Sequence, residues 1–527
     1  MQPALTRCPG CRIRFHPWNH DPIRSIAIST PTVGSRPHPY THLVAVSWCG
    51  RCCGHGQNEV RERWERGGQR VGRAELCGGR AGRRSPRKRL VRVGALMATR
   101  AGASIPRACG NWAETIGAYR LLSNPDVDPH AVQGPHRELT RNRCAELPVV
   151  LAVSDTTDLD FTGRTKVRGL GRQGDGGGRG LQQHTTLAID PFGGVIGVLN
   201  QHWFTKPQPP AGETRRARQA RWCESDVWGD AARRIGPISP ACRLIHVADR
   251  GADIFAFLDE CVRQGTGFLV RAMHDRQVLG EHSRLWEHAA AQPVLDRMDV
   301  RVSAHRTGPK RDRRVGRTAR VALRSAQATI PPPVKDPRME GAAPLTLHVV
   351  HVMEEDAPAG EGVVPVEWML LSSEPAETAQ DARRLAGWYA QRWTIEEFHR
   401  VEKEGCRLED TQLDDAEDIK RLASITAVLA VRLLQLRDAA DPDDPRADDP
   451  EALRELVPEP CIKVVAALIK VPARALTPRR FWDAVARRGG WLGRKSDGRP
   501  GWKSIWTGWR EIVLMAIGAD LMRSDSP

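Results

Sequence analysis

Two aspartates stand directly after apolar segments of the chain. Asp155 follows residues 149–153 and Asp249 follows residues 244–248, and runs of this kind are typical of strands buried on both faces. Side chains at the carboxyl ends of such strands emerge into a crevice at the sheet edge, which makes both carboxylates candidates for chemistry. An aspartate at a strand end also commonly caps a turn or a helix, and position alone leaves that alternative open.

A third carboxylate, Glu396, lies in a segment with helical spacing. Separations of three, four and seven residues link four of its side chains: Tyr389, Arg392, Glu396 and Lys403. On a continuous helix they fall within an arc of roughly 60°. A carboxylate flanked by cations suits a metal ligand beside a polyanion, with Arg392 and Lys403 holding phosphate oxygens. The alternative is an ordinary Arg392–Glu396 pair on an exposed helix, worth about 0.2 to 0.5 kcal/mol, and spacing alone favours it.

The elements that must position these residues follow from the apolar pattern. Residues 185–199 predict a hairpin with Asp-Pro-Phe-Gly-Gly as its turn. Thr378 and Asp381 predict the start of a long helix that ends near Gly405. The strand after residue 149 is expected to end at Ser154–Asp155. Other predicted elements are helices within 88–124, 254–263, 419–436 and 458–522, and strands at 268–271, 345–353 and 368–371.

Length and composition narrow the class of protein. The 527 residues are 40% hydrophobic and 27% charged, which predicts about three or four globular domains. No apolar stretch is long enough for a membrane span, and no secretion signal opens the chain, so a cytoplasmic protein with reduced thiols is expected. Of the net charge of +16, residues 1–96 carry +13 (18 Lys and Arg against 5 Asp and Glu). Bulk charge therefore gives no argument for nucleic-acid binding by the rest of the chain.

The first 86 residues differ in character from the rest. They hold 6 of the 13 cysteines and have almost no helical or strand periodicity. Two Cys-x-x-Cys pairs, Cys8 with Cys11 and Cys49 with Cys52, could form a zinc ribbon, but the gap between the pairs exceeds the usual length of about 15 to 20 residues. A basic arm, or a stretch upstream of the true start, is the alternative.

The segment Tyr-Ala-Gln-Arg-Trp-Thr-Ile-Glu-Glu-Phe-His-Arg-Val-Glu-Lys at 389–403 closely resembles the Tyr/Arg/Glu/Lys signature of the insertion-sequence-four (Tn-five-like) family of cut-and-paste DDE transposases. Asp155 and Asp249 resemble the family's first and second catalytic aspartates. Residues 102–120 are similar to its DNA-binding helices, and residues 493–498 to a motif in its tail. The resemblance covers about residues 88 to 518, with the motifs in family order.

This resemblance implies an α/β fold with an RNase H-like catalytic core. Asp155, Asp249 and Glu396 would then bind two Mg²⁺ ions, with Mn²⁺ as a substitute, since ligands with only oxygen atoms suit these cations. The implied activity is phosphodiester hydrolysis, hairpin formation and strand transfer at transposon ends. The implied partners are the terminal inverted repeats, the target DNA and a second copy of the chain.

Five residues resemble the family's contacts to DNA. Tyr389, Arg392 and Lys403 match its contacts to the backbone of the transposon end. Trp368 matches the tryptophan that stacks on a base flipped out during hairpin formation, although a tryptophan in an apolar strand is usually part of the core. Arg271 matches a further DNA contact, although an arginine at a strand end is more often a surface charge.

The expected organisation has four parts. Residues 1–87 form a basic extension, 88–140 a helical module that binds DNA ends, 141–415 the core with a β-rich insertion at about 275–366, and 416–527 a helical region assigned to dimerisation. The extension does not resemble the start of family members. A catalytically inactive, DNA-binding remnant of a transposase is therefore the alternative function, and sequence does not separate either from a metal-dependent nuclease without strand transfer.

Overall fold

The fold was analysed in a computed structural model. It describes residues 26–28 and 84–524, apart from 101, 175–176, 207–209, 211, 215–216, 218–220, 281, 303–315, 335, 358–364, 442–446 and 495–496. The four cysteines of the predicted zinc ribbon lie outside the described residues, as does most of the 1–87 extension.

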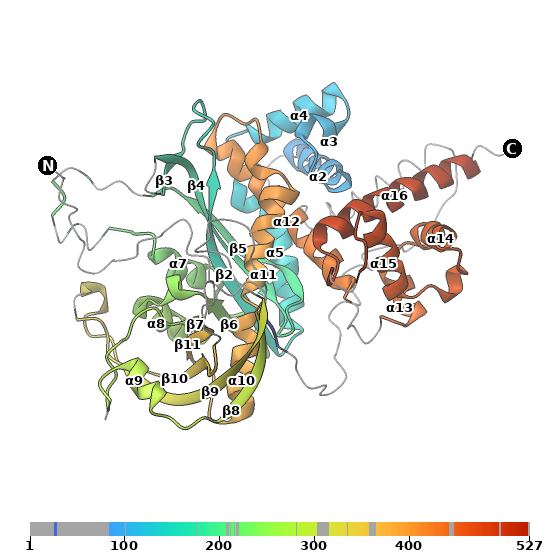
Figure 1. The fold of residues 1–527 in the computed structure, drawn as a ribbon. Coiled ribbons are helices and arrows are strands. Elements are labelled where there is room, and N and C mark those ends of the chain that lie inside the picture. The colour runs from blue at the N-terminus through green and yellow to red at the C-terminus, as the bar shows by residue number, and fades with distance from the viewer. Residues whose placement is uncertain are drawn as a thin grey trace.

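A single sheet forms the centre of the molecule (Figure 1). The eleven described strands follow the order β1-β8-β9-β10-β11-β7-β6-β2-β4-β3, and β5 pairs with β4. Strands β2, β6 and β7 are parallel neighbours, and the other pairs are antiparallel. The bounds are β1 Ile26–Ile28, β2 Val149–Asp160, β3 Gly171–Gln173, β4 Gly178–Ile189, β5 Val195–Phe204, β6 Arg243–Ala248, β7 Gly267–Arg271, β8 Asp296–Val302, β9 Arg317–Ile330, β10 Leu345–Glu354 and β11 Glu367–Ser372.

Helices cover both faces of this sheet (Figure 1). Near the sheet or within the core run α5 Pro129–Ala145, α7 Asp226–Ile235, α8 Phe255–Arg263, α9 Leu285–Ala290, α10 Ala379–Ala390, α11 Trp393–Arg400 and α12 Ala416–Ala439. The N-terminal helices are α2 Arg84–Thr99, α3 Ile105–Cys109 and α4 Trp112–Leu122, and the C-terminal helices are α13 Pro450–Leu456, α14 Glu459–Leu468, α15 Pro478–Arg488 and α16 Trp502–Ser524. The mixture of helices and a mixed sheet confirms the α/β class.

Alternation along the central strands decides which face each side chain occupies. Leu151 and Val153 of β2 pack in the same core as Ile245 and Val247 of β6, together with side chains of α10, α11 and α12. Asp155 follows Val153 by two residues, so its side chain belongs to the face that these three helices cover.

The predicted hairpin is present as β4 and β5. Its turn is held by the Asp190 carboxylate, whose Oδ1 accepts hydrogen bonds from the backbone N–H groups of Phe192 (2.8 Å) and Gly194 (2.9 Å). Gly193 has a φ of +95°, a left-handed conformation that glycine adopts without steric cost. The turn sequence therefore predicted the place of this connection.

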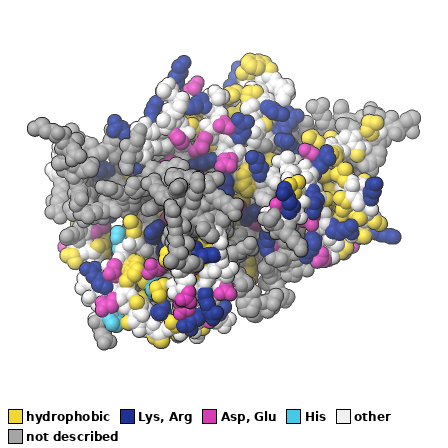
Figure 2. Space-filling view, in the orientation of Figure 1, with side chains coloured by type: hydrophobic (Ala, Val, Ile, Leu, Met, Phe, Trp, Pro, Cys, Tyr) yellow, Lys and Arg dark blue, Asp and Glu magenta, His cyan; other side chains and the backbone are white. Residues whose placement is uncertain are grey.

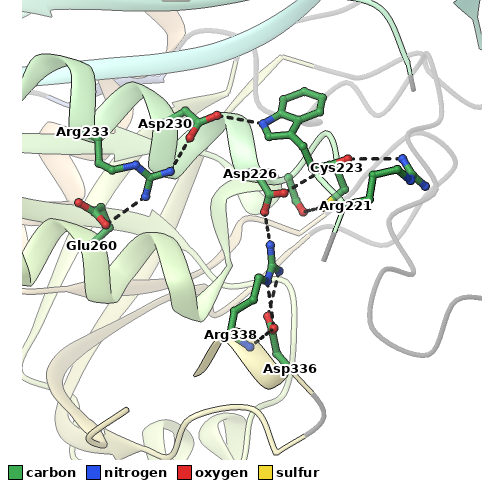
Figure 3. A network of polar contacts seen from close by, with 10 residues as sticks. Arg221, Cys223, Asp226, Asp230, Arg233, Glu260, Asp336 and Arg338 are labelled. Atoms are coloured by element: carbon green, nitrogen blue, oxygen red, sulfur yellow. Dashed lines mark hydrogen bonds and ion pairs between the residues drawn. The ribbon is translucent and has the colours of Figure 1, made fainter. Parts of the chain in front are cut away.

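The β-rich insertion packs against α7 through charged side chains (Figure 3). Arg338 donates hydrogen bonds to Asp226 of α7 (2.6 Å) and to Asp336, and these bonds raise the pKa of its guanidinium. Arg233 of α7 donates to Glu260 of α8 (3.1 Å). These contacts fix the insertion, α7 and α8 to one another.

One buried arginine of α12 adds polar contacts to the apolar packing of the N-terminal helices against the core. Arg421 donates to the backbone carbonyls of Leu122 (2.8 Å) and Val127 (2.7 Å), and it also pairs with Asp418 (2.9 Å). Its side chain is buried, and few surface contacts could replace three such bonds. The end of α4 is thereby held against the helix that covers the sheet.

The C-terminal helices form a separate apolar cluster with exposed apolar side chains. Figure 2 shows hydrophobic side chains gathered over these helices at the right of the view. The exposed large apolar residues of this region are Leu468, Leu492, Leu514 and Met522. Apolar surface of this kind is typical of an interface with another protein.

Two expectations about local structure were wrong. Strand β2 does not end at Asp155 but continues to Asp160, because β4 pairs with it over this whole length. The expected helix from Thr378 to Gly405 has the predicted capping box of Thr378 with Asp381, but it is interrupted between α10 and α11.

Two further findings concern the class of protein. Within the described part of the chain, no helix is both long and apolar enough to cross a membrane. Six of the described cysteines are buried: Cys109, Cys144, Cys242, Cys261, Cys406 and Cys461.

Candidate active site

The two candidate aspartates lie level on neighbouring strands. Strands β2 and β6 are parallel and in register up to the pair Val153 and Val247, and each aspartate follows two residues later. Asp249 ends its strand and caps a short turn, because its Oδ1 accepts a hydrogen bond from the N–H of Gly251 (2.8 Å). The capping alternative is thus present at Asp249, in the same place that brings it beside Asp155.

Arg392 brings the third carboxylate to Asp155. It occupies the break between α10 and α11, and its Nη2 lies 2.7 Å from Oε1 of Glu396 while its Nη1 lies 3.8 Å from Oδ2 of Asp155. The arginine side chain is only 6% exposed, and the two carboxylates are 22% and 23% exposed. The pair at i and i+4 expected for a plain surface helix therefore exists, but within a partly buried cluster where charges interact more strongly.

The electrostatics of Asp155 reflect this crowding. Burial, reinforced by the negative charges of Asp249 and Glu396, raises the pKa of the Asp155 carboxyl to about 8, and Arg392 opposes this rise. A carboxyl surrounded by like charges is stabilised by any additional cation. The site is therefore rich in negative charge that one guanidinium does not fully compensate.

Asp155, Asp249 and Glu396 are candidate ligands for a divalent cation. Within the described residues, no group of three or more His, Cys, Asp or Glu is already arranged to hold a metal ion. The donor chemistry nevertheless fits: Asp155, Asp249 and Glu396 offer only oxygen ligands, as Mg²⁺ prefers, and after burial the charges of Asp249 and Glu396 contribute to the raised pKa of Asp155.

Tyr389 and Trp368 face the core rather than the surface. Each residue is 2% exposed, and their rings pack edge to face with centroids 5.0 Å apart. Gln391 and Arg392 separate α10 from α11, although both keep right-handed helical φ and ψ angles. The shared helical face expected for Tyr389, Glu396 and Lys403 stays a prediction.

The other two predicted DNA contacts bind carbonyl groups of the chain. Lys403 donates to the backbone carbonyl of Asp158 in β2 and lies 3.5 Å from Glu409. Arg271, at the end of β7, donates to the carbonyl of Glu367 (2.8 Å). Arg271 thus lies beside Trp368, and Lys403 lies along the same strand as Asp155.

Glu402 is a buried carboxylate that was not among the residues predicted from the sequence. It belongs to a π-helical turn, η5 (Val401–Gly405), and it is 0% exposed. Its neighbours are uncharged hydrogen-bond donors of β4, β5 and α12: Gln183, Gln201 and Thr426. A signal existed, because Glu402 follows the apolar Phe398 by four residues and so continues the buried stripe of α11.

Glu402 gives a testable dependence of stability on pH. Burial raises its pKa from 4.5 to about 7, although three hydrogen bonds oppose the rise. The folded protein therefore retains a proton that the unfolded chain releases, and stability falls as pH rises from about 4.5 to 7. We expect Glu402→Gln to gain up to about 3 kcal/mol over the wild type between pH 5 and pH 8, measured by urea denaturation at both values. An equal difference at both pH values would contradict the raised pKa.

The N-terminal and C-terminal regions of the chain each match a model of a known protein family. Residues 83–127 match a family model described as Transposase DNA-binding, and residues 449–527 match one described as Transposase Tn5 dimerisation domain. The first range contains α2 to α4, and the second contains α13 to α16 with their exposed apolar side chains. DNA and a second copy of the chain are accordingly the partners of this protein. The two matches confirm the resemblance seen in the sequence: they support a Tn5-like transposase, and the insertion-sequence-four family is consistent with them.

Proposed function

We propose that this transposase is an active, metal-dependent enzyme that hydrolyses phosphodiester bonds, forms hairpins and transfers strands at transposon ends. The observation that carries the proposal is the cluster of Asp155, Asp249 and Glu396: two lie level on parallel strands, and the third shares Arg392 with the first. Carboxylates that repel one another at one place on a sheet are typical of functional sites rather than of structural ion pairs.

The proposal includes an RNase H-like core. What supports it is the strand order β5-β4-β2-β6-β7 within the sheet, in which three consecutive antiparallel strands are followed by two parallel ones. That order is the one expected of such a core. We further propose the boundaries 88–140 for the end-binding module, 141–415 for the core with its insertion, and 416–527 for the dimerisation region.

In this proposal each side chain has a defined task. Asp155, Asp249 and Glu396 would hold two Mg²⁺ ions, or Mn²⁺ in their place. The chemistry that such ions supply is activation of the attacking hydroxyl and stabilisation of the leaving oxygen. Arg392 keeps a positive charge between two carboxylates, and it can transfer that charge to a phosphate oxygen with which guanidinium forms paired hydrogen bonds.

The proposed DNA contacts differ in how exposed their side chains are. Lys403 is partly exposed at 24% and lies beside β2, where it can reach a backbone phosphate next to the carboxylates. Arg271 lies at the end of β7, one strand beyond β6. Tyr389 and Trp368 are buried, so direct contact with DNA requires their rings to become exposed.

A cleavage assay on the DNA that flanks the reading frame tests the proposal. The full chain, incubated with its own terminal inverted repeats, is expected to nick them in Mg²⁺ and to leave them intact in a chelator. Binding that weakens steeply with salt but is never followed by cleavage, in Mg²⁺ or Mn²⁺, would favour the inactive DNA-binding remnant instead. The observation that favours this alternative is that, within the described residues, no group of three or more His, Cys, Asp or Glu is arranged to hold a metal ion.

Trp368 allows a separate prediction about hairpin formation. Trp368→Ala empties a fully buried site and is expected to lower the free energy of unfolding by about 3 to 5 kcal/mol. Trp368→Phe keeps most of the packing with Tyr389 and is expected to cost clearly less. If the residue stacks on a flipped base, the phenylalanine variant should nick normally but form fewer hairpins. Equal loss of both steps on a gel would indicate a defect of folding.

A further inference from the structure

Glu402 belongs to a buried polar cluster between the helix of Glu396 and the sheet of Asp155. The cluster is formed by seven side chains, each 5% exposed or less: Gln133, Gln183, Thr185, Gln201, Trp203, Glu402 and Thr426. They come from α5, β4, β5, η5 and α12. A buried group of this kind fixes the relative position of the elements that contribute to it.

The register of the strands connects this cluster to the candidate site. Asp155 of β2 is the direct partner of Thr185 in β4, which in turn is the partner of Gln201 in β5. Partners in adjacent strands have side chains on the same face of a sheet. Gln201 donates to the Thr185 hydroxyl (3.3 Å) and approaches both oxygens of Glu402 (3.4 and 3.5 Å). A row of contacts therefore runs from Glu402 to the strand position opposite Asp155.

The orientation of each amide requires an acceptor at position 402. The indole N–H of Trp203 donates to Oε1 of Gln183 (2.7 Å), and an indole can only donate. Nε2 of Gln183 must then point the other way, where it donates to Oε2 of Glu402 at 2.6 Å. Gln133 orients Gln201 in the same manner, since it donates to Oε1 of that residue at 2.5 Å.

Stability alone does not account for a carboxylate at this place. The burial that raises its pKa also makes its ionised form costly, whereas a neutral acceptor such as a glutamine amide avoids that cost. The two oxygens of a carboxylate can accept several hydrogen bonds from different directions. Those of Glu402 accept from β4, from β5 and from Thr426 of α12 (3.3 Å). Glu402 follows Glu396 by six residues, in the helical segment formed by α11 and η5.

We propose that Glu402 is a positioning residue, which locks α11 and η5 against β4 and β5 and so sets the spacing between Glu396 and Asp155. This inference rests on the proposed function, because the spacing matters for binding a metal ion between those carboxylates. Residues that hold metal ligands in place typically change metal affinity or activity by about 10-fold to 100-fold when replaced.

Calorimetric titration of the full chain with Mn²⁺, without DNA, tests this role by a measurement that does not depend on activity. Glu402→Leu is expected to bind Mn²⁺ about 10-fold to 100-fold more weakly, and its melting temperature should fall because Gln183 and Gln201 lose their acceptor. Glu402→Gln, which can still accept from Gln183, is expected to retain most of the affinity. The matched control is Glu404→Leu, the same change at an exposed position of the same turn, which should leave the affinity unchanged.

A second variant covers the case in which Glu402→Leu does not fold. Gln183→Met removes the closest donor to Glu402 at nearly constant volume, and it too should weaken Mn²⁺ binding. Wild-type affinity in whichever of these variants folds would overturn the positioning role, provided that Asp155→Asn reduces binding. If the wild type and Asp155→Asn bind Mn²⁺ alike, the proposed function itself fails, so the two failures are distinguishable.

Discussion

Asp155→Asn is expected to lower the rate of DNA cleavage by about 10³-fold or more, because a neutral amide cannot replace a carboxylate that contributes several kcal/mol of charge stabilisation with a metal ion. The fold should remain intact. Three carboxylates repel one another around Asp155, and removal of one negative charge should not lower the free energy of unfolding. Single-turnover cleavage and urea denaturation of the same preparation give the two values.

Asp158→Asn is the matched control for this experiment. It makes the same chemical change three residues further along β2, and the backbone carbonyl that accepts from Lys403 remains. Cleavage by the control should stay close to that of the wild type. Cleavage at the wild-type rate by a pure preparation of Asp155→Asn would exclude this residue from the chemistry.

Asp253→Ala is expected to have the largest effect on stability. The Asp253 side chain is 0% exposed and accepts hydrogen bonds from the backbone N–H groups of Met273 (2.8 Å) and His274 (3.0 Å). The Arg276 guanidinium adds two further bonds, at 2.6 and 2.9 Å. Removing one partner of a buried ion pair leaves the other charge uncompensated, which costs about 3 to 5 kcal/mol.

A surface pair in the neighbouring helix provides the comparison for Asp253. Asp259 pairs with Arg263, whose side chain is 60% exposed, one helical turn away at 3.0 Å, and such pairs contribute about 0.2 to 1 kcal/mol. Denaturation of Asp259→Ala should therefore differ little from that of the wild type. A loss below about 1 kcal/mol in Asp253→Ala would show that the network around Arg276 rearranges to satisfy its members.

Features that depend on local sequence were predictable. The β4–β5 turn follows from Asp190 and Gly193, the start of α10 from Thr378 with Asp381, and the central strands from continuous apolar runs. In each case the residues that determine the structure lie within a few positions of one another. Chemistry of turns and caps is therefore readable without knowledge of the fold.

Features set by distant parts of the chain were not predictable. Nothing in Gln391 and Arg392 opposes a helix, since both have good helical propensity, and the break coincides with the contact of Arg392 with Asp155 of β2. Strand β2 is extended by its pairing with β4. The same holds for Glu402, because its partners Gln183 and Gln201 lie 219 and 201 residues away in the chain. The catalytic roles of Asp155, Asp249 and Glu396 remain predictions.

The bonds from Arg421 to the carbonyls of Leu122 and Val127 bear on the distance between the DNA sequence that would be recognised and the site of the cut. The matched DNA-binding range ends at residue 127, so one anchor holds its last residues to the helix that covers the sheet. A duplex bound by that range would then approach Asp155 from a single direction. The number of base pairs between the recognised sequence and the cut would therefore be the same at each transposon end.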